Sequence, residues 1–218
     1  MFPALYAVLD PILTPEPAGF ARKLVEAGVQ LLQLRDKRGS SRRMYEQARE
    51  LTSLQTRGVR IIVNDRPDIA AMAGASGVHV GQDDLPAEEA RKICKPPLWV
   101  GVSTHDLKQF KEAEATSADY IAVGPIFPTD TKENPDPVVG LELLRAARRL
   151  THKPLVAIGG ITLERAAEVY AAGADSLAVI RDLVVASAAE DSQEQEDYPR
   201  ERARQYLAVA ESARKMRS

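Results

Sequence analysis

Short apolar runs rich in Val, Ile and Leu recur along the whole chain, each closed by a turn residue or a charge, and this repetition constrains the fold more than any other feature. The runs fall at Leu5–Asp10, Leu31–Asp36, Arg60–Asp65, Gly77–Gln82, Leu98–Ser103, Tyr120–Pro125, Pro154–Gly160 and Ser176–Asp182. Segments with a helical pattern lie between them, at Pro17–Ala27, Arg42–Arg57, Ala87–Ile93, Leu107–Ser117, Leu141–Leu150 and Leu163–Ala172. We therefore expect strand and helix to alternate throughout.

Buried parallel strands joined by right-handed helical crossovers form either a closed eight-stranded barrel or an open doubly wound sheet. Eight regular units favour the barrel. A glycine-rich dinucleotide-binding turn does not follow the first run, which makes the open sheet the weaker alternative. A chain of 218 residues is long enough for one such domain. We predict a single-domain α/β protein, a (β/α)8 TIM barrel over residues 1–218.

After the eighth run the sequence becomes polar and then returns to a helical pattern. Residues 188–198 are polar and mostly acidic, which predicts a solvated loop. Pro199–Met216 then resumes a helical pattern with an apolar face, which predicts a helix that closes the ring.

Composition excludes several classes of partner. Lys and Arg number 29 against 31 Asp and Glu, so no global positive field is present to gather nucleic acid or an anionic membrane surface. No apolar stretch approaches the roughly 20 residues of a membrane helix, and the N-terminus lacks the pattern of a signal peptide. The single cysteine, Cys94, suits a reducing compartment. We expect a cytoplasmic protein without membrane or nucleic-acid partners; a homo-oligomer remains open.

Polar residues follow the second run, at the end of a parallel barrel where active sites lie. A period of two places Gln33, Arg35 and Lys37 on one side of the strand and Leu32 and Leu34 on the other. If the leucines face the helices, the polar side chains point into the barrel. A buried unpaired cation costs several kcal/mol, an order-of-magnitude value, which an anionic ligand would offset. The alternative is a salt-bridged strand end at the surface.

Carboxylates end the third and fourth runs. Asp65 and Asp84 provide hard oxygen ligands facing the cations of the second run, which is the arrangement expected where Mg²⁺ joins a diphosphate to a protein. The alternative for Asp83 or Asp84 is a helix N-cap, because Pro86 and a helix follow. His79 lies inside an apolar strand and is expected to be a satisfied core residue.

The remaining strand ends offer hydroxyls, one cation and glycines. Ser103 is expected to be a hydrogen-bond donor, since no nucleophile elbow surrounds it. Thr129, Thr131 and Lys132 lie close together in the loop after the sixth run, which is typical of a phosphate-binding loop. The Gly159–Gly160 pair lets backbone N–H groups approach a phosphate where TIM barrels usually hold it.

Five sequence motifs, in this order and at these strand ends, together resemble the thiamine-phosphate synthase family: residues 33–37, 64–66, 77–84, 124–132 and 159–161. The resemblance covers nearly the whole chain up to Asp182. It implies a transferase of the alkyl/aryl class that joins hydroxymethylpyrimidine diphosphate to a thiazole phosphate, with Mg²⁺, and releases pyrophosphate. Asp65 and Asp84 would hold the metal, and Arg35, Lys37 and Lys132 would be catalytic. The other substrate contacts would be Gln33, Leu34, Asp36, Asn64, Ser103, Thr129, Asp130, Thr131, Gly160, Ile180 and Arg181.

Arg181 departs from the family, which usually has a small hydroxyl residue there. It either grips the thiazole phosphate or turns toward a carboxylate such as Asp182, and we favour the second arrangement. Two rival functions share the fold. A thiazole tautomerase has no need of the cations and carboxylates named above, and a non-catalytic barrel would bind a phosphorylated metabolite without turnover. The sequence leaves open whether the thiazole is carboxylated.

Overall fold

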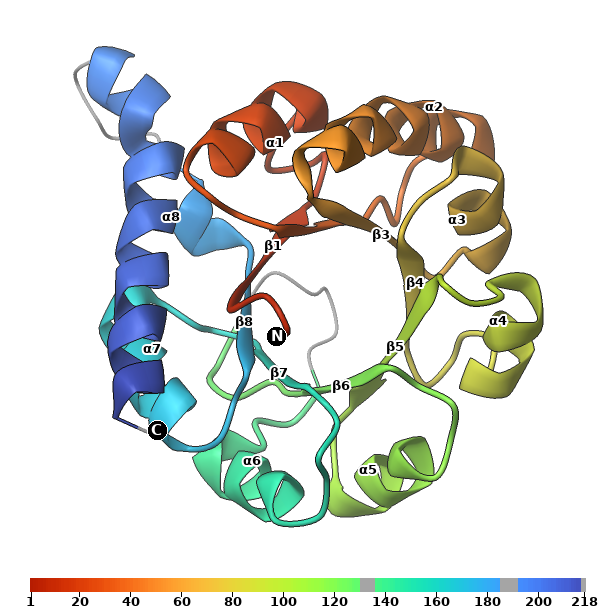
Figure 1. Ribbon diagram of the computed structural model, residues 1–218, viewed down its shortest axis with the longest axis vertical. Helices are drawn as coiled ribbons and strands as arrows, with labels where there is room; N and C mark the ends of the chain where they lie inside the picture. Colours follow the sequence, from red (N-terminus) through yellow and green to blue (C-terminus); the bar gives the residue numbers. More distant parts are fainter. Residues whose placement is uncertain (130–135, 185–191, 217–218) are drawn as a thin grey trace.

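The computed structural model is a closed barrel of parallel strands surrounded by helices (Figure 1). It describes residues 1–129, 136–184 and 192–216. Within these ranges the strands are β1 Leu5–Leu9, β2 Leu31–Leu34, β3 Arg60–Asn64, β4 Gly77–Val80, β5 Trp99–Thr104, β6 Tyr120–Val123, β7 Leu155–Ile158 and β8 Ser176–Val179. Each strand pairs with the next in sequence, and β1 pairs with β8 from Leu5↔Leu177 to Ala7↔Val179, which closes the ring. The predicted (β/α)8 barrel is confirmed.

Helices follow the strands and pack around the barrel (Figure 1). They are α1 Pro17–Glu26, α2 Ser41–Thr52, α3 Pro67–Ala73, α4 Ala87–Ile93, α5 Leu107–Glu114, α6 Gly140–Arg148, α7 Leu163–Ala171 and α8 Ser192–Lys215, with 3₁₀ helices at Ser53–Arg57 and Arg181–Leu183. Local residues explain several boundaries. Pro17 and Pro67 begin α1 and α3, where the missing N–H costs nothing, and the Ser40 hydroxyl caps α2 by accepting from the N–H of Arg43.

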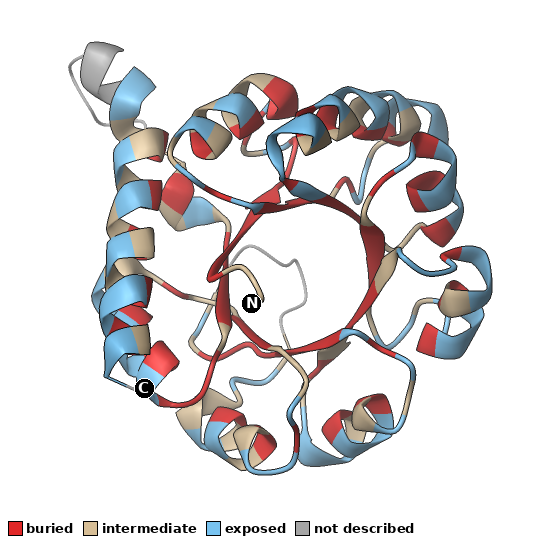
Figure 2. Cartoon of the chain, in the orientation of Figure 1, coloured by how far each residue is buried: buried red, intermediate tan, exposed pale blue. Residues whose placement is uncertain are grey.

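Buried side chains form two clusters, an outer and an inner layer, one on each side of the strands. The strands of the barrel are coloured as buried almost throughout in Figure 2. The outer layer lies between strands and helices and includes Leu32 and Leu34, as the period-two pattern predicted. The inner layer fills the lumen with Tyr6, Val8, Leu31, Ile62, Tyr120, Ala122, Val156 and Ala178. At the amino end of the barrel Phe2 stacks on Trp99, with ring centroids 5.2 Å apart. A larger open space lies at the carboxyl ends of the strands.

The last helix differs from the sequence prediction in its first residue. We expected a loop over 188–198 and a helix from Pro199, whereas α8 begins at Ser192 and contains Pro199. Glu and Gln are good helix formers, and acidic residues are favourable near the positive end of the helix dipole, so residues 192–198 extend the helix. The apolar face expected of this segment is present, because Ala203, Tyr206 and Ala210 are buried.

None of the helices in the described ranges combines the length and apolar character that a membrane span requires.

Candidate active site

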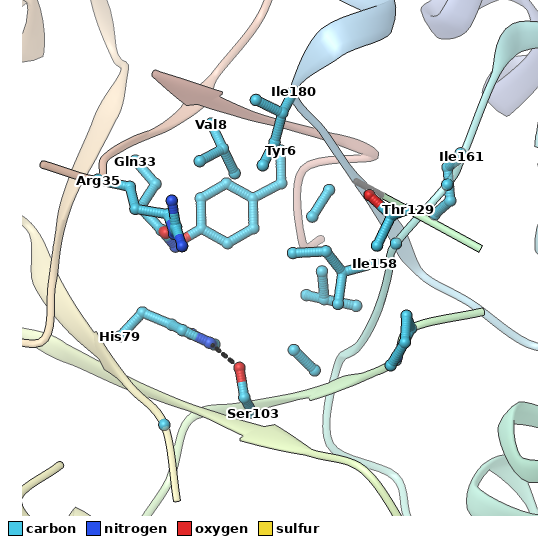
Figure 3. Close-up of a pocket in the computed structure, with 18 of the residues that line it drawn as sticks. Tyr6, Val8, Gln33, Arg35, His79, Ser103, Thr129, Ile158, Ile161 and Ile180 are labelled. Atoms are coloured by element: carbon cyan, nitrogen blue, oxygen red, sulfur yellow. Dashed lines mark hydrogen bonds between the residues drawn. The ribbon is translucent and has the colours of Figure 1, made fainter. Parts of the chain in front are cut away.

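A cavity of about 760 Å³ opens at the carboxyl ends of the strands. All eight strands of the described barrel contribute to its lining, so it lies on the barrel axis (Figure 3). Its floor is apolar, formed by Val8, Ala122, Val156, Ile158 and Ala178. Polar and charged side chains stand around the wall. The cavity therefore suits a small molecule with an apolar body and charged groups.

The cations expected on β2 do face the cavity, and each has a carboxylate partner. Arg35 donates to Asp10 Oδ2 at 2.8 Å, and the Asp10 carboxylate is 6% exposed. Lys37 Nζ forms an ion pair with Asp65 Oδ2. The prediction that these side chains point inward is confirmed. Asp10 also offsets part of the charge that we had assigned wholly to an anionic ligand.

Asp65 and Asp84 lie side by side at the ends of β3 and β4. Burial raises the pKa of Asp65, the hydrogen bond with Asp84 adds to the rise and Lys37 opposes it, and together these effects bring the pKa to about 6. Asp65 also adopts φ 62°, the left-handed region that Asp tolerates better than most residues. Asp84 Oδ2 accepts from the N–H of Gly81 at 2.8 Å, which fixes the carboxylate by a local turn.

These two carboxylates fit a divalent cation. Two acidic groups this close repel each other unless a proton or a cation offsets their charge, and Asp84 adds to the rise in pKa that burial gives Asp65. Within the described residues no group of three or more His, Cys, Asp or Glu side chains is arranged to hold a metal. Mg²⁺ commonly binds through one or two carboxylates and completes its shell with water and substrate phosphates, so a two-carboxylate site suits it.

A chain of hydrogen bonds crosses the lumen below this cluster. Gln33 Nε2 donates to the Tyr6 hydroxyl at 2.7 Å, and the hydroxyls of Tyr6 and Tyr120 are 2.9 Å apart. His79 Nδ1 lies 3.1 Å from the Tyr120 hydroxyl, and His79 Nε2 lies 2.8 Å from Ser103 Oγ (Figure 3). His79 is 6% exposed, so the prediction that it is a satisfied core residue is confirmed.

Asn64 completes this side of the cavity. It is 7% exposed and lines the cavity, and its side chain makes no hydrogen bond to the described residues. Asn64 is therefore accessible to a polar ligand in the cavity.

Glycines shape the opposite wall. Gly159 and Gly160 have φ 96° and 62°, and a Cβ at Gly160 would collide with the backbone of Pro128. The N–H groups of Ile126 and Phe127 donate to the carbonyls of Ile158 and Gly159, at 2.8 and 3.0 Å. The loop after β6 is therefore held directly against the glycine turn after β7. Thr129, Ile180 and Arg181 line the cavity on this side.

Asp182, which also lines the cavity, joins three elements on this side. Its carboxylate accepts from the N–H of Leu163 at 3.0 Å, from the Tyr206 hydroxyl at 2.6 Å, and from two guanidinium nitrogens of Arg202 at 2.9 and 3.0 Å. These contacts tie the end of β8 to the start of α7 and to α8. Arg181 lines the cavity beside this group.

Two of the proposed substrate contacts lie elsewhere than the cavity wall. Leu34 is fully buried in the outer layer, facing the helices. Asp36 is buried behind the strand end, where its Oδ1 accepts from the N–H groups of Arg38 and Gly39. Asp36 thus folds the turn that carries Lys37. Asp130, Thr131 and Lys132 fall outside the residues that the structure describes.

Sequence reasoning did not assign roles to several residues that line or support the cavity. Tyr6 was identifiable by its inward position on the first strand, and Asp10 by its place at the end of that strand. His105 Nδ1 lies 2.6 Å from the Gly124 carbonyl oxygen. Arg165 donates to the Gly160 carbonyl at 2.9 Å and covers the ring of Phe127. His105 and Arg165 support loops that meet only in the folded barrel, so no local signal marks them.

A closed (β/α)8 barrel with cations, paired carboxylates and a glycine turn at its carboxyl ends defines a class: barrel enzymes that act on phosphorylated small molecules. The chain matches the thiamine monophosphate synthase family over residues 5–183. It is 49% identical to a thiamine-phosphate synthase of Koribacter versatilis over 216 residues, which is 96% of this chain and 97% of the relative. A thiamine-phosphate synthase of Methanospirillum hungatei is 44% identical over 83% of this chain and 89% of its own length. The chain belongs to the thiamine monophosphate synthase family.

The fold comparison agrees with the sequence comparison. A solved thiamine phosphate pyrophosphorylase from Pyrococcus furiosus superposes with a TM-score of 0.82 at 34% identity, and the match covers 96% of both chains.

Proposed function

We propose that this chain is a transferase that joins hydroxymethylpyrimidine diphosphate to a thiazole phosphate and releases pyrophosphate. One observation carries the proposal: Arg35, Lys37 and the Asp65–Asp84 pair stand on one side of a cavity whose other side is the Gly159–Gly160 turn. A diphosphate and a second, singly phosphorylated substrate need two such separate anion sites. The relatives named thiamine-phosphate synthase support the same reaction.

The site would act on the diphosphate through charge. Breaking the bond between the methylene carbon and the diphosphate moves negative charge onto the leaving group, and Arg35 and Lys37, which line the cavity, would neutralise it. Lys132 is proposed as a third cation on the sequence motif alone. Asp65 and Asp84 would hold Mg²⁺, which when bound supplies further positive charge beside the diphosphate.

The other residues would position the two rings. Gln33, Asn64 and Ser103 surround the apolar floor on the β2–β5 side, so we place the aminopyrimidine there. Thr129, Gly160, Ile180 and Arg181 surround the opposite side, where we place the thiazole phosphate. The thiazole nitrogen brings its own lone pair, so the reaction needs orientation and charge stabilisation and no general base.

Pyrophosphate release tests the proposal. The purified protein should release pyrophosphate only when both substrates and Mg²⁺ are present, and omission of any one of the three should stop release. Release without the thiazole phosphate would identify a hydrolase and contradict the proposal. A thiazole tautomerase or a non-catalytic barrel would release none under any condition.

A further inference from the structure

In the buried hydrogen-bond chain of the lumen, each group donates to the next in one order. This order bears on how the site binds the pyrimidine. The chain runs through Gln33, Tyr6, Tyr120, His79 and Ser103, which come from different strands. Its middle members have almost no access to water: Tyr6 is 1% exposed and Tyr120 is fully buried. Buried polar atoms must find partners within the protein, so each proton of the chain has to be assigned to one bond.

Space for the chain is built into the barrel. A Cβ on Gly101 would overlap the ring of Tyr120, so glycine at this position of β5 lets Tyr120 reach the centre of the lumen. Tyr120 also stacks on the imidazole of His79, with centroids 5.5 Å apart, and meets Tyr6 edge to face. The three rings therefore hold each other in place, and their polar atoms are fixed relative to the strands.

The protons can be counted along the chain. Burial raises the pKa of both tyrosines, so each hydroxyl keeps its proton. Burial also lowers the pKa of His79 to about 4, so its ring carries one N–H at neutral pH. Gln33 donates an amide N–H to Tyr6, and the Tyr6 proton then has one acceptor among the described residues, the oxygen of Tyr120.

The remaining bonds follow from that start. Tyr120 has accepted from Tyr6, so it donates its own proton to His79 Nδ1. With Nδ1 accepting, the N–H of the neutral imidazole must be on Nε2, and it points at Ser103 Oγ. With Gln33 Nε2 facing Tyr6, the reverse direction would leave the Tyr6 proton without an acceptor in the part of the chain that the structure describes.

We propose that His79 is a positioning residue: it donates from Nε2 to Ser103 Oγ and thereby leaves the Ser103 hydroxyl to donate its proton into the cavity. This inference rests on the proposed function, in which Ser103 contacts the pyrimidine diphosphate. Ser103 then binds an acceptor atom of that substrate. His79 contributes to affinity without touching the substrate, because it decides which way the serine proton points.

Two amide substitutions at residue 79 separate the two ring nitrogens. The amide nitrogen of Gln reaches the place of Nε2 and can donate to Ser103, whereas the shorter Asn reaches only the place of Nδ1 and the Tyr120 hydroxyl. Each is made in the wild-type chain and in a Ser103→Ala chain, and the Michaelis constant for the pyrimidine diphosphate is measured. Thermal unfolding of all variants reports folding separately.

His79→Asn and Ser103→Ala should each raise this Michaelis constant about tenfold, the size of one lost hydrogen bond. His79→Gln should stay within about threefold of wild type. In the Ser103→Ala chain, His79→Asn should add no further loss, because its only route to the substrate is gone. The Michaelis constant for the thiazole phosphate should not change.

The proposal is overturned if the losses from His79→Asn and Ser103→Ala multiply, or if Gln is as damaging as Asn. A purely structural role for His79 would give these results, since a distorted barrel weakens the site whether or not Ser103 is present. If the wild-type chain forms no product, the proposed function has failed, and that outcome is visible before any variant is made.

Discussion

Asp65 combines three unusual properties in one residue: a left-handed backbone, a raised pKa and a lysine partner. Each follows from its position at the end of β3, where the strand turns sharply and brings the carboxylate beside Asp84. The backbone conformation also decides which substitution is informative. Alanine at φ 62° costs roughly 1 kcal/mol in strain, whereas asparagine adopts this region readily, so Asp65→Asn removes the charge without disturbing the turn.

The first prediction concerns Asp65 and metal dependence. Asp65→Asn and Asp84→Asn should each raise the Mg²⁺ concentration needed for half-maximal turnover by more than about tenfold, because each removes an oxygen ligand charge. Asp83→Asn is the matched control, adjacent in sequence and exposed, and should change this concentration less than about threefold. Equal effects of all three variants would show that only net charge at the cavity mouth matters.

The second prediction is a pH dependence of stability without Mg²⁺. The pKa of Asp65 is 3.8 in the unfolded chain and about 6 in the folded one, so the folded state holds the proton more tightly. The protonated Asp65 carboxyl therefore contributes its full share of the free energy of unfolding below about pH 3.8. This share is lost as the pH rises through about 6. Asp65→Asn should therefore gain about 1–2 kcal/mol relative to wild type between about pH 4 and pH 7, measured by urea unfolding. Parallel pH curves would contradict the assignment.

The third prediction separates the two anion sites. Lys37→Met should raise the Michaelis constant for the pyrimidine diphosphate more than about tenfold and leave that for the thiazole phosphate within about threefold. Arg38→Met removes a charge from the next, exposed residue and serves as the control. Equal losses for both substrates would mean that Lys37 shapes the barrel end generally.

The fourth prediction concerns Arg181, which lines the cavity after β8. Backbone N–H groups near Gly160 are available for a phosphate, and the guanidinium is expected to turn toward a carboxylate. Arg181→Ser should therefore change the Michaelis constant for the thiazole phosphate by less than about tenfold, equivalent to roughly 1.4 kcal/mol. A loss of about a hundredfold confined to this substrate would identify Arg181 as a direct phosphate ligand.

At the scale of elements, Asp182 links β8, α7 and α8 through one carboxylate. The fifth prediction follows from these contacts. Tyr206→Phe removes a partly buried 2.6 Å hydrogen bond to this charge and should lower the free energy of unfolding by about 1–2 kcal/mol. Tyr198→Phe, on the same helix, loses only a 3.4 Å contact to the Asp182 carbonyl and should cost less than about 0.5 kcal/mol. Denaturant unfolding measures the free energy of unfolding of both variants. Equal losses would show that the hydrogen bond from Tyr206 to the Asp182 carboxylate does not stabilise the fold more than the Tyr198 contact does.

The strands were predictable because each buried strand is a short apolar run that is visible in the local sequence. Gln33 and Arg35 could be placed inside the barrel from period two alone, since the intervening leucines had to meet the helices. Supporting residues could not be found this way: Asp10 meets Arg35, and Tyr120 meets His79, only after the ring closes. The start of α8 was also missed, because an acidic segment suits a loop and a helix equally until the helix packs.

At the scale of the whole molecule, the closed barrel brings the eight strand ends to one rim, where the Arg35 and Lys37 cations and the Gly159–Gly160 turn line one cavity with an apolar floor. Residues distant in sequence, such as Lys37 and Gly160, thereby line the same cavity. Family membership and this geometry agree on a reaction that joins two phosphorylated rings.

The most direct test is the mass of the product formed from both substrates with Mg²⁺. The account predicts one product that contains both heterocycles and a single phosphate, formed in equal amount with pyrophosphate. Pyrophosphate accompanied by free hydroxymethylpyrimidine, or a thiazole phosphate altered without joining, would contradict it.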